Sequence, residues 1–441
     1  MSEPPAAATA VGGFFSLADE RLELGGEGYS PGVLRKIEYA GGNHRSFAAA
    51  KESLQRLAEF EISDKHVERL TERLGRERAA ARDQTAAAME AGKLRSVYKQ
   101  PPAVVVISID AGKAQFRDQD KGVGVHNARW GDTKVACLQT YTNVEYDKDP
   151  QPEPPEAFLN PARVERLTRE MQKIRGTGID KSDKPPKEKV PEPLEPPAKN
   201  KKRKKNNRPQ RLVRTVVATT AKVEEFGWMV SAEAMTRKMY AAPRRAIVGD
   251  GGNWIEPLGQ LHFPGWIQIL DFLHLLVHLF AAARLAFVGD PKAAWKLYEQ
   301  MLRDAWGGRV QNVIDALQSR LRRSAANQST THKDAATVVE LTLNYVRRNR
   351  ERMDYPRYRQ LGLPVGSAMV ESLIKQINHR VKGTEQFWNN GGLEAVLQVR
   401  AAYLSNDDRA EKHHQQRPRA PAVGRNRSMG RTKAGQFQAT G

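Results

Sequence analysis

The chain has 441 residues, of which 71 are Lys or Arg and 51 are Asp or Glu, giving a formal net charge of +20. Its single cysteine, Cys137, excludes an intrachain disulfide and argues against a thiolate zinc site, in keeping with a reducing cytoplasm. No run reaches the roughly 18 apolar residues that a membrane-spanning helix needs, and no secretory signal pattern is present. The clustered positive charge predicts a polyanionic partner; the alternative is a basic surface that serves only solubility.

Residues 1–29 are rich in Ala, Gly and Glu, and we expect them to form a flexible lead. Three runs with apolar residues at helical spacing follow, each preceded by a serine that is typical of a helix N-cap. These serines are Ser30, Ser46 and Ser63. The short connection between the second and third helices resembles a helix-turn-helix, which predicts a DNA-binding domain over residues 30–100. A small helical bundle without a role in DNA binding is the alternative.

The third predicted helix offers a row of basic side chains to DNA. They are Lys65, Arg69, Arg73, Arg76 and Arg78. Side chains of this kind contact phosphates or base edges when a recognition helix enters the major groove. Gly41 and Gly42 are expected to end the first predicted helix, because glycine is a poor helix former.

A new region begins at Pro101 and is predicted to be the first part of an α/β core, over residues 101–145. The run from Ala103 to Asp110 is almost continuously apolar, which predicts a strand that is buried on both faces and ends at Asp110. A second strand is predicted over residues 134–141.

Residues 146–210 are rich in Pro, Glu and Lys and cannot bury enough apolar surface to order themselves. We therefore predict a largely disordered insertion between strands of one domain, with one short helix over about residues 161–175. The most basic part of this insertion is predicted to bind DNA phosphates. It consists of Lys201, Lys202, Arg203, Lys204 and Lys205.

The second part of the core is predicted over residues 211–262, with strands at 212–219 and 246–249 and a helix at 231–240. A helical insertion is predicted to follow over residues 263–360. Its expected helices cover residues 265–288, 291–305, 307–323 and 331–350.

The last part of the core is predicted over residues 361–405, with helices at 367–381 and 391–405. Residues 406–441 are basic and polar, and we expect them to form a disordered tail. Strands that come first and helices that come later predict an α/β fold, in which a mixed sheet carries a helical extension and the site lies at the carboxyl ends of strands.

Three acids stand out as candidates for catalysis. Asp110 and Asp250 each follow an apolar run, and Glu371 lies on a helix after a Gly- and Pro-rich segment. Together they predict an oxygen-rich pocket suited to paired Mg²⁺ ions and in-line phosphoryl transfer. The alternatives are turn-forming aspartates at positions 110 and 250, and a surface ion pair between Glu371 and Lys375.

Asp271, His274 and His278 are spaced to share one face of a helix. A His pair at this spacing can hold zinc, but no Glu follows the first His and the sequence offers no further ligand nearby. We therefore interpret Asp271 and His274 as a polar network that supports the active site.

The helix of Glu371 also carries Lys375, Arg380 and, just beyond it, Lys382, which suits a helix lying against a phosphate backbone. Trp388 could stack on a distorted or flipped base near the cut, with a place in the core as the alternative. Trp254, close to Asp250, has the same two interpretations.

Several segments form a pattern when they are taken together. They are Asp110, Asp250-Gly251-Gly252, Asp271-Phe272-Leu273-His274, and Gly362–Ser372 followed by Arg380-Val381-Lys382-Gly383-Thr384 and Trp388. This pattern resembles the bacterial insertion-sequence transposases of the ISKra group, relatives of the Mutator-type DDE transposases. The resemblance covers about residues 30–405. Its Asp271-x-x-His274 element is similar to the Cys/Asp-x-x-His signature of the wider clan.

The resemblance implies a ribonuclease H-like catalytic core with a helical insertion between the second Asp and the Glu. It implies that Asp110, Asp250 and Glu371 hold two Mg²⁺ (or Mn²⁺) ions, which serve DNA cleavage and strand transfer. The implied partners are DNA of the element's terminal repeats and of the target, and further copies of the chain assembled on that DNA. The implied location is the cytoplasm, at the nucleoid, with no membrane partner.

Two positions depart from what we expect of the family: Ala368 stands in place of Gly, and Val277 in place of an acidic residue. Two other functions remain as alternatives. One is a catalytically decayed or repurposed DNA-binding protein, and the other is a metal-dependent nuclease that does not transfer strands.

Overall fold

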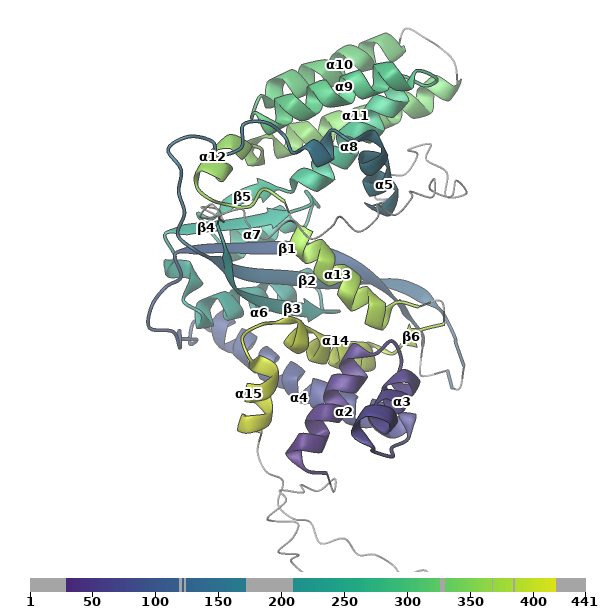
Figure 1. The fold of residues 1–441 in the computed structure, drawn as a ribbon, viewed down its shortest axis with the longest axis vertical. Helices are drawn as coiled ribbons and strands as arrows, with labels where there is room; N and C mark the ends of the chain where they lie inside the picture. Colours follow the sequence, from purple (N-terminus) through teal and green to yellow (C-terminus); the bar gives the residue numbers. More distant parts are fainter. Residues whose placement is uncertain are drawn as a thin grey trace, which may run out of the picture.

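The described part of the chain is built around a six-stranded mixed sheet with the order β3-β2-β1-β4-β5 and a short β6 beside β1 (Figure 1). The strands are β1 (Val104–Phe116), β2 (Arg129–Tyr141), β3 (Arg211–Thr219), β4 (Arg244–Gly249), β5 (Ile267–Leu270) and β6 (Phe387–Trp388). This computed structural model describes residues 29–118, 121–122, 124–171, 209–325, 330–366, 368–383 and 385–417. The predicted α/β fold with a mixed sheet is confirmed.

Strands β1, β2 and β3 are antiparallel neighbours, whereas β4 and β5 run parallel to β1 on its other side. The apolar run at the start of β1 has the composition of a central strand, and its residues Val104 to Ile109 are buried on both faces. The parallel ladders of these three strands end at the same level, after Ile109, Gly249 and Leu270, although β1 itself continues. Sites in open α/β sheets form at the carboxyl ends of parallel strands.

One face of the sheet is covered by α6 (Val223–Thr236) and α7 (Ile255–His262). Alternate residues of β1, among them Ile107 and Ile109, are fully buried against Phe226 in this layer. The opposite face of β1, β2 and β3 is covered by helices α13 (Ala368–Val381) and α14 (Asn390–Leu404). The sheet is therefore packed between helices from distant parts of the sequence.

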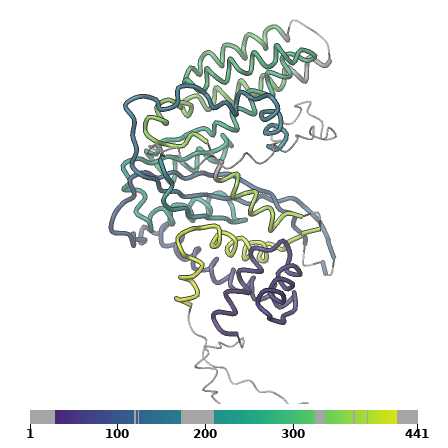
Figure 2. Tube along the Cα trace, viewed as in Figure 1, coloured from purple at the N-terminus to yellow at the C-terminus, as the bar shows by residue number. Residues whose placement is uncertain are grey.

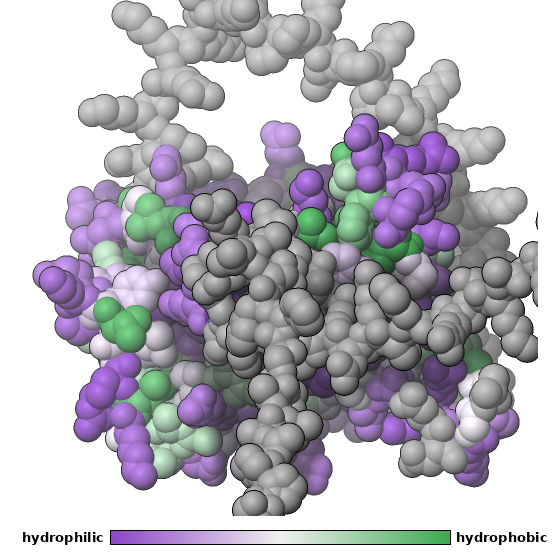
Figure 3. Space-filling view, turned by 90° about the horizontal axis from the view of Figure 1, so that it is seen from below, coloured by the Kyte–Doolittle hydropathy of each residue, from purple (hydrophilic) through white to green (hydrophobic). Residues whose placement is uncertain are grey.

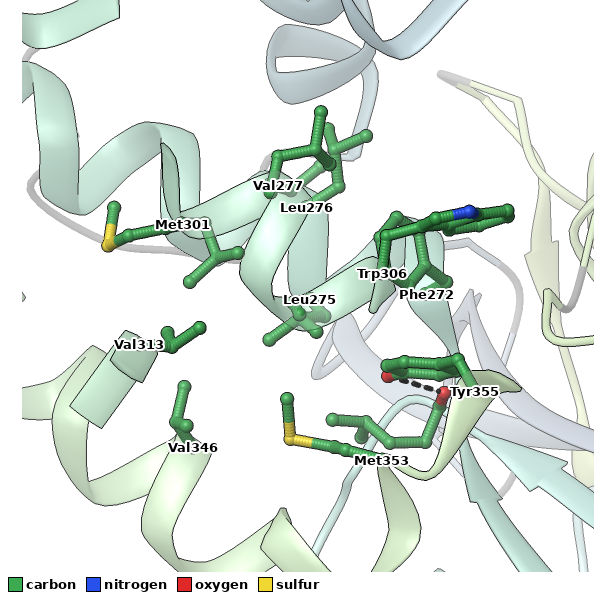
Figure 4. Packing of buried hydrophobic residues seen from close by; sticks show 14 of the residues in the cluster. Phe272, Leu275, Leu276, Val277, Met301, Trp306, Val313, Val346, Met353 and Tyr355 are labelled. Carbon is green, nitrogen blue, oxygen red and sulfur yellow. Dashed lines mark hydrogen bonds between the residues drawn. The ribbon is translucent and has the colours of Figure 1, made fainter. Parts of the chain in front are cut away.

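Four helices form a layer beyond β5, which we call the helical bundle (Figure 1). They are α8 (Phe272–Ala286), α9 (Pro291–Trp306), α10 (Val310–Ala325) and α11 (Thr330–Asn349). The core of the bundle is apolar and continuous with that of the sheet, and Figure 4 shows Phe272, Trp306 and Tyr355 at this junction. The bundle begins directly after β5, so its first helix is fixed to the sheet edge.

The terminal helices lie at the other side of the sheet, in what we call the terminal-helix assembly. Helices α2 (Pro31–Asn43), α3 (Phe47–Ala58) and α4 (Asp64–Glu90) pack there with α14 and α15 (Arg409–Gln416). Figure 2 shows the first helices beside the last ones, although they are far apart in sequence. Seen from this end, the surface is mostly hydrophilic with small apolar patches (Figure 3).

The three predicted N-caps are confirmed. The side chains of Ser30, Ser46 and Ser63 accept hydrogen bonds from backbone N–H groups three residues later, at 3.4, 3.1 and 3.2 Å. The prediction that Gly41 and Gly42 end the first helix is wrong, because both lie inside α2. A Cβ at either glycine would overlap a neighbouring side chain, so glycine there permits close packing on α4 and α14.

Two boundaries predicted for the core and one predicted for the helical insertion are wrong. Strand β1 does not end at Asp110 but continues to Phe116, because β2 pairs with it along its whole length. The helix expected at 231–240 begins earlier, at Val223. The helix expected at 265–288 contains strand β5, which pairs with β4, so the region 263–360 is not purely helical.

The short helix predicted at about 161–175 within the insertion is confirmed as α5 (Pro161–Met171). The residues before it were predicted to be disordered, but they pack on the helical bundle, where Tyr298 donates a hydrogen bond to the Phe158 carbonyl at 2.9 Å. Residues 172–208, including the predicted Lys201–Lys205 cluster, lie outside the described residues. The first part of the tail predicted to be disordered from residue 406 instead forms α15, which is held by ion pairs of Glu411 and His414 to α2. Arg417, which follows α15, pairs with Glu77 of α4, and residues 418–441 lie outside the described residues.

Candidate metal centre

Three aspartates follow the last residues that pair in the parallel ladders of β1, β4 and β5. The register pairs Ile109 of β1 with Gly249 of β4, and Gly249 with Leu270 of β5. The next residues on these strands are Asp110, Asp250 and Asp271. Because adjacent strands lie about 4.8 Å apart, the backbone alone brings the three aspartates to one edge of the parallel part of the sheet.

Asp110 faces the side of the sheet that α13 covers. The residue is 6% exposed, and its Oδ1 accepts a hydrogen bond from the Ala111 N–H at 2.7 Å. Gly112, two residues later and so on the same face, lies beneath α13, since a Cβ built there would be 3.7 Å from Ile374. Asp110 therefore lies on the face crossed by the helix that carries Glu371.

Asp250 begins a turn that the helical bundle holds in place. Its Oδ1 accepts a hydrogen bond from the Gly252 N–H at 2.9 Å. Its carbonyl accepts one from the Tyr345 hydroxyl at 2.8 Å, and Arg348 donates to the Gly251 carbonyl, also at 2.8 Å. Gly251 has a φ of +78°, and a Cβ there would be 2.8 Å from the Tyr345 ring. Both its conformation and its packing therefore require glycine.

Asp271 joins the end of β5 to the start of α8. Its side chain is fully buried, and Oδ1 accepts a hydrogen bond from the Leu273 N–H at 3.1 Å as the N-cap of the helix. The other carboxylate oxygen contacts Nδ1 of His274, one turn into α8. This contact orients the imidazole, as expected of a carboxylate beside a histidine that binds a metal or supports a site.

Glu371 enters this site from the first turn of α13. The preceding segment is tied to α8, because the Phe272 N–H donates to the Val365 carbonyl at 3.0 Å. Glu371 Oε1 lies 3.9 Å from His274 Nδ1. One ligand atom each from Asp271, His274 and Glu371 lies within 4.8 Å of the other two, so this group could hold a metal ion.

The structure thus brings Glu371 together with Asp271 and His274, the pair that the sequence pattern assigned to a supporting role. The sequence did contain the signal for placing Asp271 after a strand. The run Trp266-Ile267-Gln268-Ile269-Leu270 precedes it, much as apolar runs precede Asp110 and Asp250. By merging this run into a helix, the prediction hid the third strand-end aspartate.

Tyr345 is a residue of the site that the sequence pattern did not reveal. Burial raises its pKa well above the usual value, and the carboxylates of Asp250 and Asp271 raise it further. Its hydroxyl is therefore a neutral hydrogen-bond donor at any working pH. Its ring stacks on His278, with centroids 4.0 Å apart. Tyr345 comes from α11, about 95 residues after Asp250 in the sequence, and no local motif marks it.

Two residues predicted to contact DNA are buried instead. Arg380 is 1% exposed, donates to the Gly41 carbonyl at 2.8 Å and lies over the rings of Phe47 and Trp388. Burial lowers the pKa of Arg380 to about 10, with a further contribution from Arg400. Trp388 is 8% exposed and donates to the Val381 carbonyl at 2.9 Å. Both side chains join α13 to the terminal-helix assembly, so neither can reach DNA in this structure.

The other predicted DNA contacts differ in exposure, and the side chain of Arg78 on α4 is buried in an ion pair with Glu38 at 2.7 Å. Lys65 and Arg69 are exposed on α4, whereas Arg73 is half-buried beside Glu77. Lys375 is exposed and forms an ion pair with Glu170 at 3.1 Å. Trp254 is half-buried, with its ring centroid 6.2 Å from that of Phe226. The structure places none of these side chains in the metal-binding group.

No protein-family model and no curated protein matches this chain. In the part of the chain that the structure describes, no helix combines the length and apolar character needed to cross a membrane.

Proposed function

We propose that this chain is a DDE-type DNA transposase of a bacterial insertion sequence, which binds the element ends and catalyses metal-dependent DNA cleavage and strand transfer. One observation carries the proposal. Asp110, Asp250 and Asp271 each follow the last residue that pairs in the parallel ladders of β1, β4 and β5, and Glu371 meets Asp271 and His274. Carboxylates gathered at a sheet edge suit divalent cations and phosphoryl transfer.

The topology supports a ribonuclease H-like core. Three antiparallel strands are followed by two that are parallel to the first, in the order β3-β2-β1-β4-β5. The helical bundle lies between Asp250 and Glu371 in the sequence, where the family resemblance leads us to expect an insertion. The net charge of +20 supports a polyanionic substrate such as DNA.

The available donors fit divalent metal ions. Asp110, Asp250 and Glu371 offer oxygen, which Mg²⁺ and Mn²⁺ prefer, whereas His274 adds a nitrogen donor that favours Mn²⁺ or other transition metals. Bound ions would supply Lewis-acid activation of the attacking oxygen and stabilise the leaving one. The protein's own part is to hold the carboxylates in place: Tyr345 and Arg348 fix the Asp250 turn, and Asp271 orients His274.

The experiment uses the full chain, Mg²⁺ or Mn²⁺, and duplexes that carry the DNA flanking its own gene. We expect nicking followed by joining of the new 3′-end to a target duplex. Asp110→Asn, Asp250→Asn and Glu371→Gln should each abolish both steps, whereas Asp315→Asn, on an exposed part of α10, should leave them unchanged. Metal-independent binding with no cleavage, identical in wild type and Asp110→Asn, would refute the proposal and indicate a DNA-binding protein.

A nuclease without strand transfer is the second candidate, and one observation favours it. The most compact ligand group, Asp271, His274 and Glu371, offers a position for a single ion. One ion that activates water is sufficient for hydrolysis, whereas joining strands needs a DNA 3′-hydroxyl as the nucleophile. Cleavage without joined product, at any metal concentration, would select this candidate.

A further inference from the structure

The hairpin of β1 and β2 extends beyond the rest of the sheet. Strand β4 pairs with β1 only as far as Ile109, and β3 pairs with β2 only from Lys134. The ladder between β1 and β2 nevertheless continues to the pair Phe116 and Arg129. Figure 1 shows this end of the hairpin reaching past the other long strands, with β6 and α13 beside it. Ala114 and Phe116 of the extension are buried against α13, so one face of the hairpin belongs to the core.

The extension carries an exposed tryptophan. Trp130 is 52% exposed, whereas Trp266, Trp306 and Trp388 are buried in the core. The Lys382 ammonium lies 5.3 Å from the centroid of the Trp130 ring, within the range of a cation–π contact. Exposing a large aromatic surface to water is unfavourable, so a ligand that covers it would gain affinity.

The backbone beneath Trp130 is firmly held. Phe116 is 4% exposed and packs on Gly131, where a Cβ would be only 2.4 Å from the ring. The guanidinium of Arg129 lies 5.2 Å from the centroid of the same ring. Phe116 therefore packs one face of the extension, while about half of the Trp130 surface stays open to solvent.

Trp130 is also linked to the helix of the metal-binding group. It pairs in register with Gln115, whose side-chain amide donates to the Gly383 carbonyl at 2.7 Å, just beyond the end of α13. Glu371 lies in the first turn of α13, and Lys382 follows its last residue. At a rise of about 1.5 Å per residue their backbones lie about 16 Å apart, which is the length of roughly five nucleotides at the spacing of about 3.4 Å that one strand of duplex DNA has.

We propose that Trp130 and Lys382 form a stacking site for an unpaired base of the DNA strand that enters the metal centre, about five nucleotides from the reacting phosphate. An aromatic face accepts any base, and the neighbouring ammonium can bind the adjoining phosphate. Exposed Arg129 and Lys121 extend the positive charge of the hairpin, whereas Lys113 is paired with Asp132 at 2.7 Å. This inference rests on the proposed function, because it takes DNA as the ligand.

The test compares two labelled DNA molecules: a blunt duplex, and the same duplex with a five-nucleotide unpaired extension. Binding is measured by fluorescence anisotropy in EDTA, so that catalysis plays no part. We expect Trp130→Ala to weaken binding of the extended DNA about tenfold and to leave the blunt duplex unaffected, and Trp130→Phe to retain most of the affinity. For the extended DNA, a plot of log affinity against log salt concentration should be shallower by about 0.7 in Lys382→Gln than in the wild type.

Two controls separate this proposal from its rivals. Leu261→Ala removes another exposed apolar side chain, 72% exposed on α7, and should change neither affinity. Thermal unfolding of each variant establishes that it folds. Equal affinity of Trp130→Ala and wild type for the extended DNA overturns the proposal, as does an equal loss with both DNA molecules.

The outcome is distinguishable from failure of the proposed function. Asp110→Asn should lose cleavage and keep the Trp130-dependent binding, since binding is measured without metal. If Trp130→Ala instead changes only the sedimentation of the free protein, Trp130 belongs to a protein interface and the base-stacking proposal is wrong.

Discussion

The helical bundle and the terminal-helix assembly flank the same sheet but are held together differently. The bundle has an apolar interior, in which Tyr298, Met301 and Val346 are fully buried. The terminal-helix assembly has an apolar core of its own and adds buried charge. Glu38 is fully buried and accepts hydrogen bonds from Arg78 and Tyr403, with His414 of α15 also in contact.

This difference shows how each region is secured to the sheet. The helical bundle begins directly after β5, so sequence continuity and apolar packing are sufficient to fix it. The terminal-helix assembly joins segments more than 300 residues apart, and its ion pairs specify which of them meet. Arg417 of the C-terminal segment, for example, bonds to Glu77 of α4 at 2.8 and 2.9 Å.

The largest expected effect comes from removing the ring that joins the helical bundle to the sheet. Tyr355 is fully buried, its ring centroid lies 4.9 Å from that of Phe272, and its hydroxyl donates to the Leu270 carbonyl at 3.1 Å. Tyr355→Ala should lower the free energy of unfolding by about 4 kcal/mol, because it leaves a cavity. Urea denaturation measures this change.

Leu341→Ala is the matched control, because its side chain is 56% exposed on α11 and should change stability by less than about 0.5 kcal/mol. A loss for Tyr355→Ala no larger than that of Leu341→Ala would show that the junction contributes little to stability.

The next effect tests the buried charge of the terminal-helix assembly. Burial raises the pKa of Glu38, but hydrogen bonds from His414 and Arg78 outweigh it and lower the pKa to about 2, from a usual value of 4.5. The carboxylate therefore contributes stability above about pH 4.5 that is lost as the pH falls toward 2. This lowering of the Glu38 pKa corresponds to about 3 kcal/mol in the free energy of unfolding.

Urea midpoints measured from pH 6 to pH 2.5 should fall in the wild type and in Tyr355→Ala, and fall less in Glu38→Gln. At pH 6, Glu38→Gln should itself be destabilised by about 3 kcal/mol, since Arg78 loses its buried partner. Glu52→Gln removes an exposed ion pair with Arg56 and should have little effect. Parallel pH profiles for wild type and Glu38→Gln would contradict the assigned role of Glu38.

Local patterns in the sequence predicted much of this fold. The serine caps, the apolar runs of β1 and β4, and the amphipathic helices of the bundle depend on interactions between residues close in the chain. The short strand β5 was missed because Ile267 to Leu270 is too brief to distinguish from the helix that follows, and only its pairing with β4 identifies it.

The candidate site was predicted only in part, for the same physical reason. Asp110, Asp250 and Glu371 stand in recognisable local contexts, but the grouping of Glu371 with Asp271 and His274 depends on how α13 crosses the sheet. Burial of Arg380 and Trp388 likewise depends on α2 and α3, which lie more than 300 residues earlier. No pattern within one segment contains that information.

A smaller effect is expected where the helical bundle touches the metal centre. Tyr345→Phe removes the hydrogen bond to the Asp250 carbonyl, which should lower stability by about 1 kcal/mol and Mn²⁺ affinity by about tenfold. Calorimetric titration with Mn²⁺ measures the affinity. Tyr298→Phe removes a similar bond, to the Phe158 carbonyl, within the same bundle and should leave Mn²⁺ binding unchanged. Equal Mn²⁺ affinities of the wild type, Tyr345→Phe and Tyr298→Phe would show that the bundle does not organise the site.

The smallest effect concerns the surfaces of the two regions rather than their interiors. Lys65 and Arg69 are exposed on α4, so replacing both with Ala should leave stability within about 0.5 kcal/mol of the wild type. If α4 contacts DNA phosphates, the log–log dependence of DNA affinity on salt should become shallower by about 1.8, or about 0.9 for each charge.

Replacing Lys292 and Lys296 of α9 with Ala removes the same charge from the exposed surface of the helical bundle. A shallower slope only for the α4 variant would assign duplex binding to the terminal-helix assembly, whereas equal slopes for both variants would show that net charge alone, and no particular surface, governs affinity.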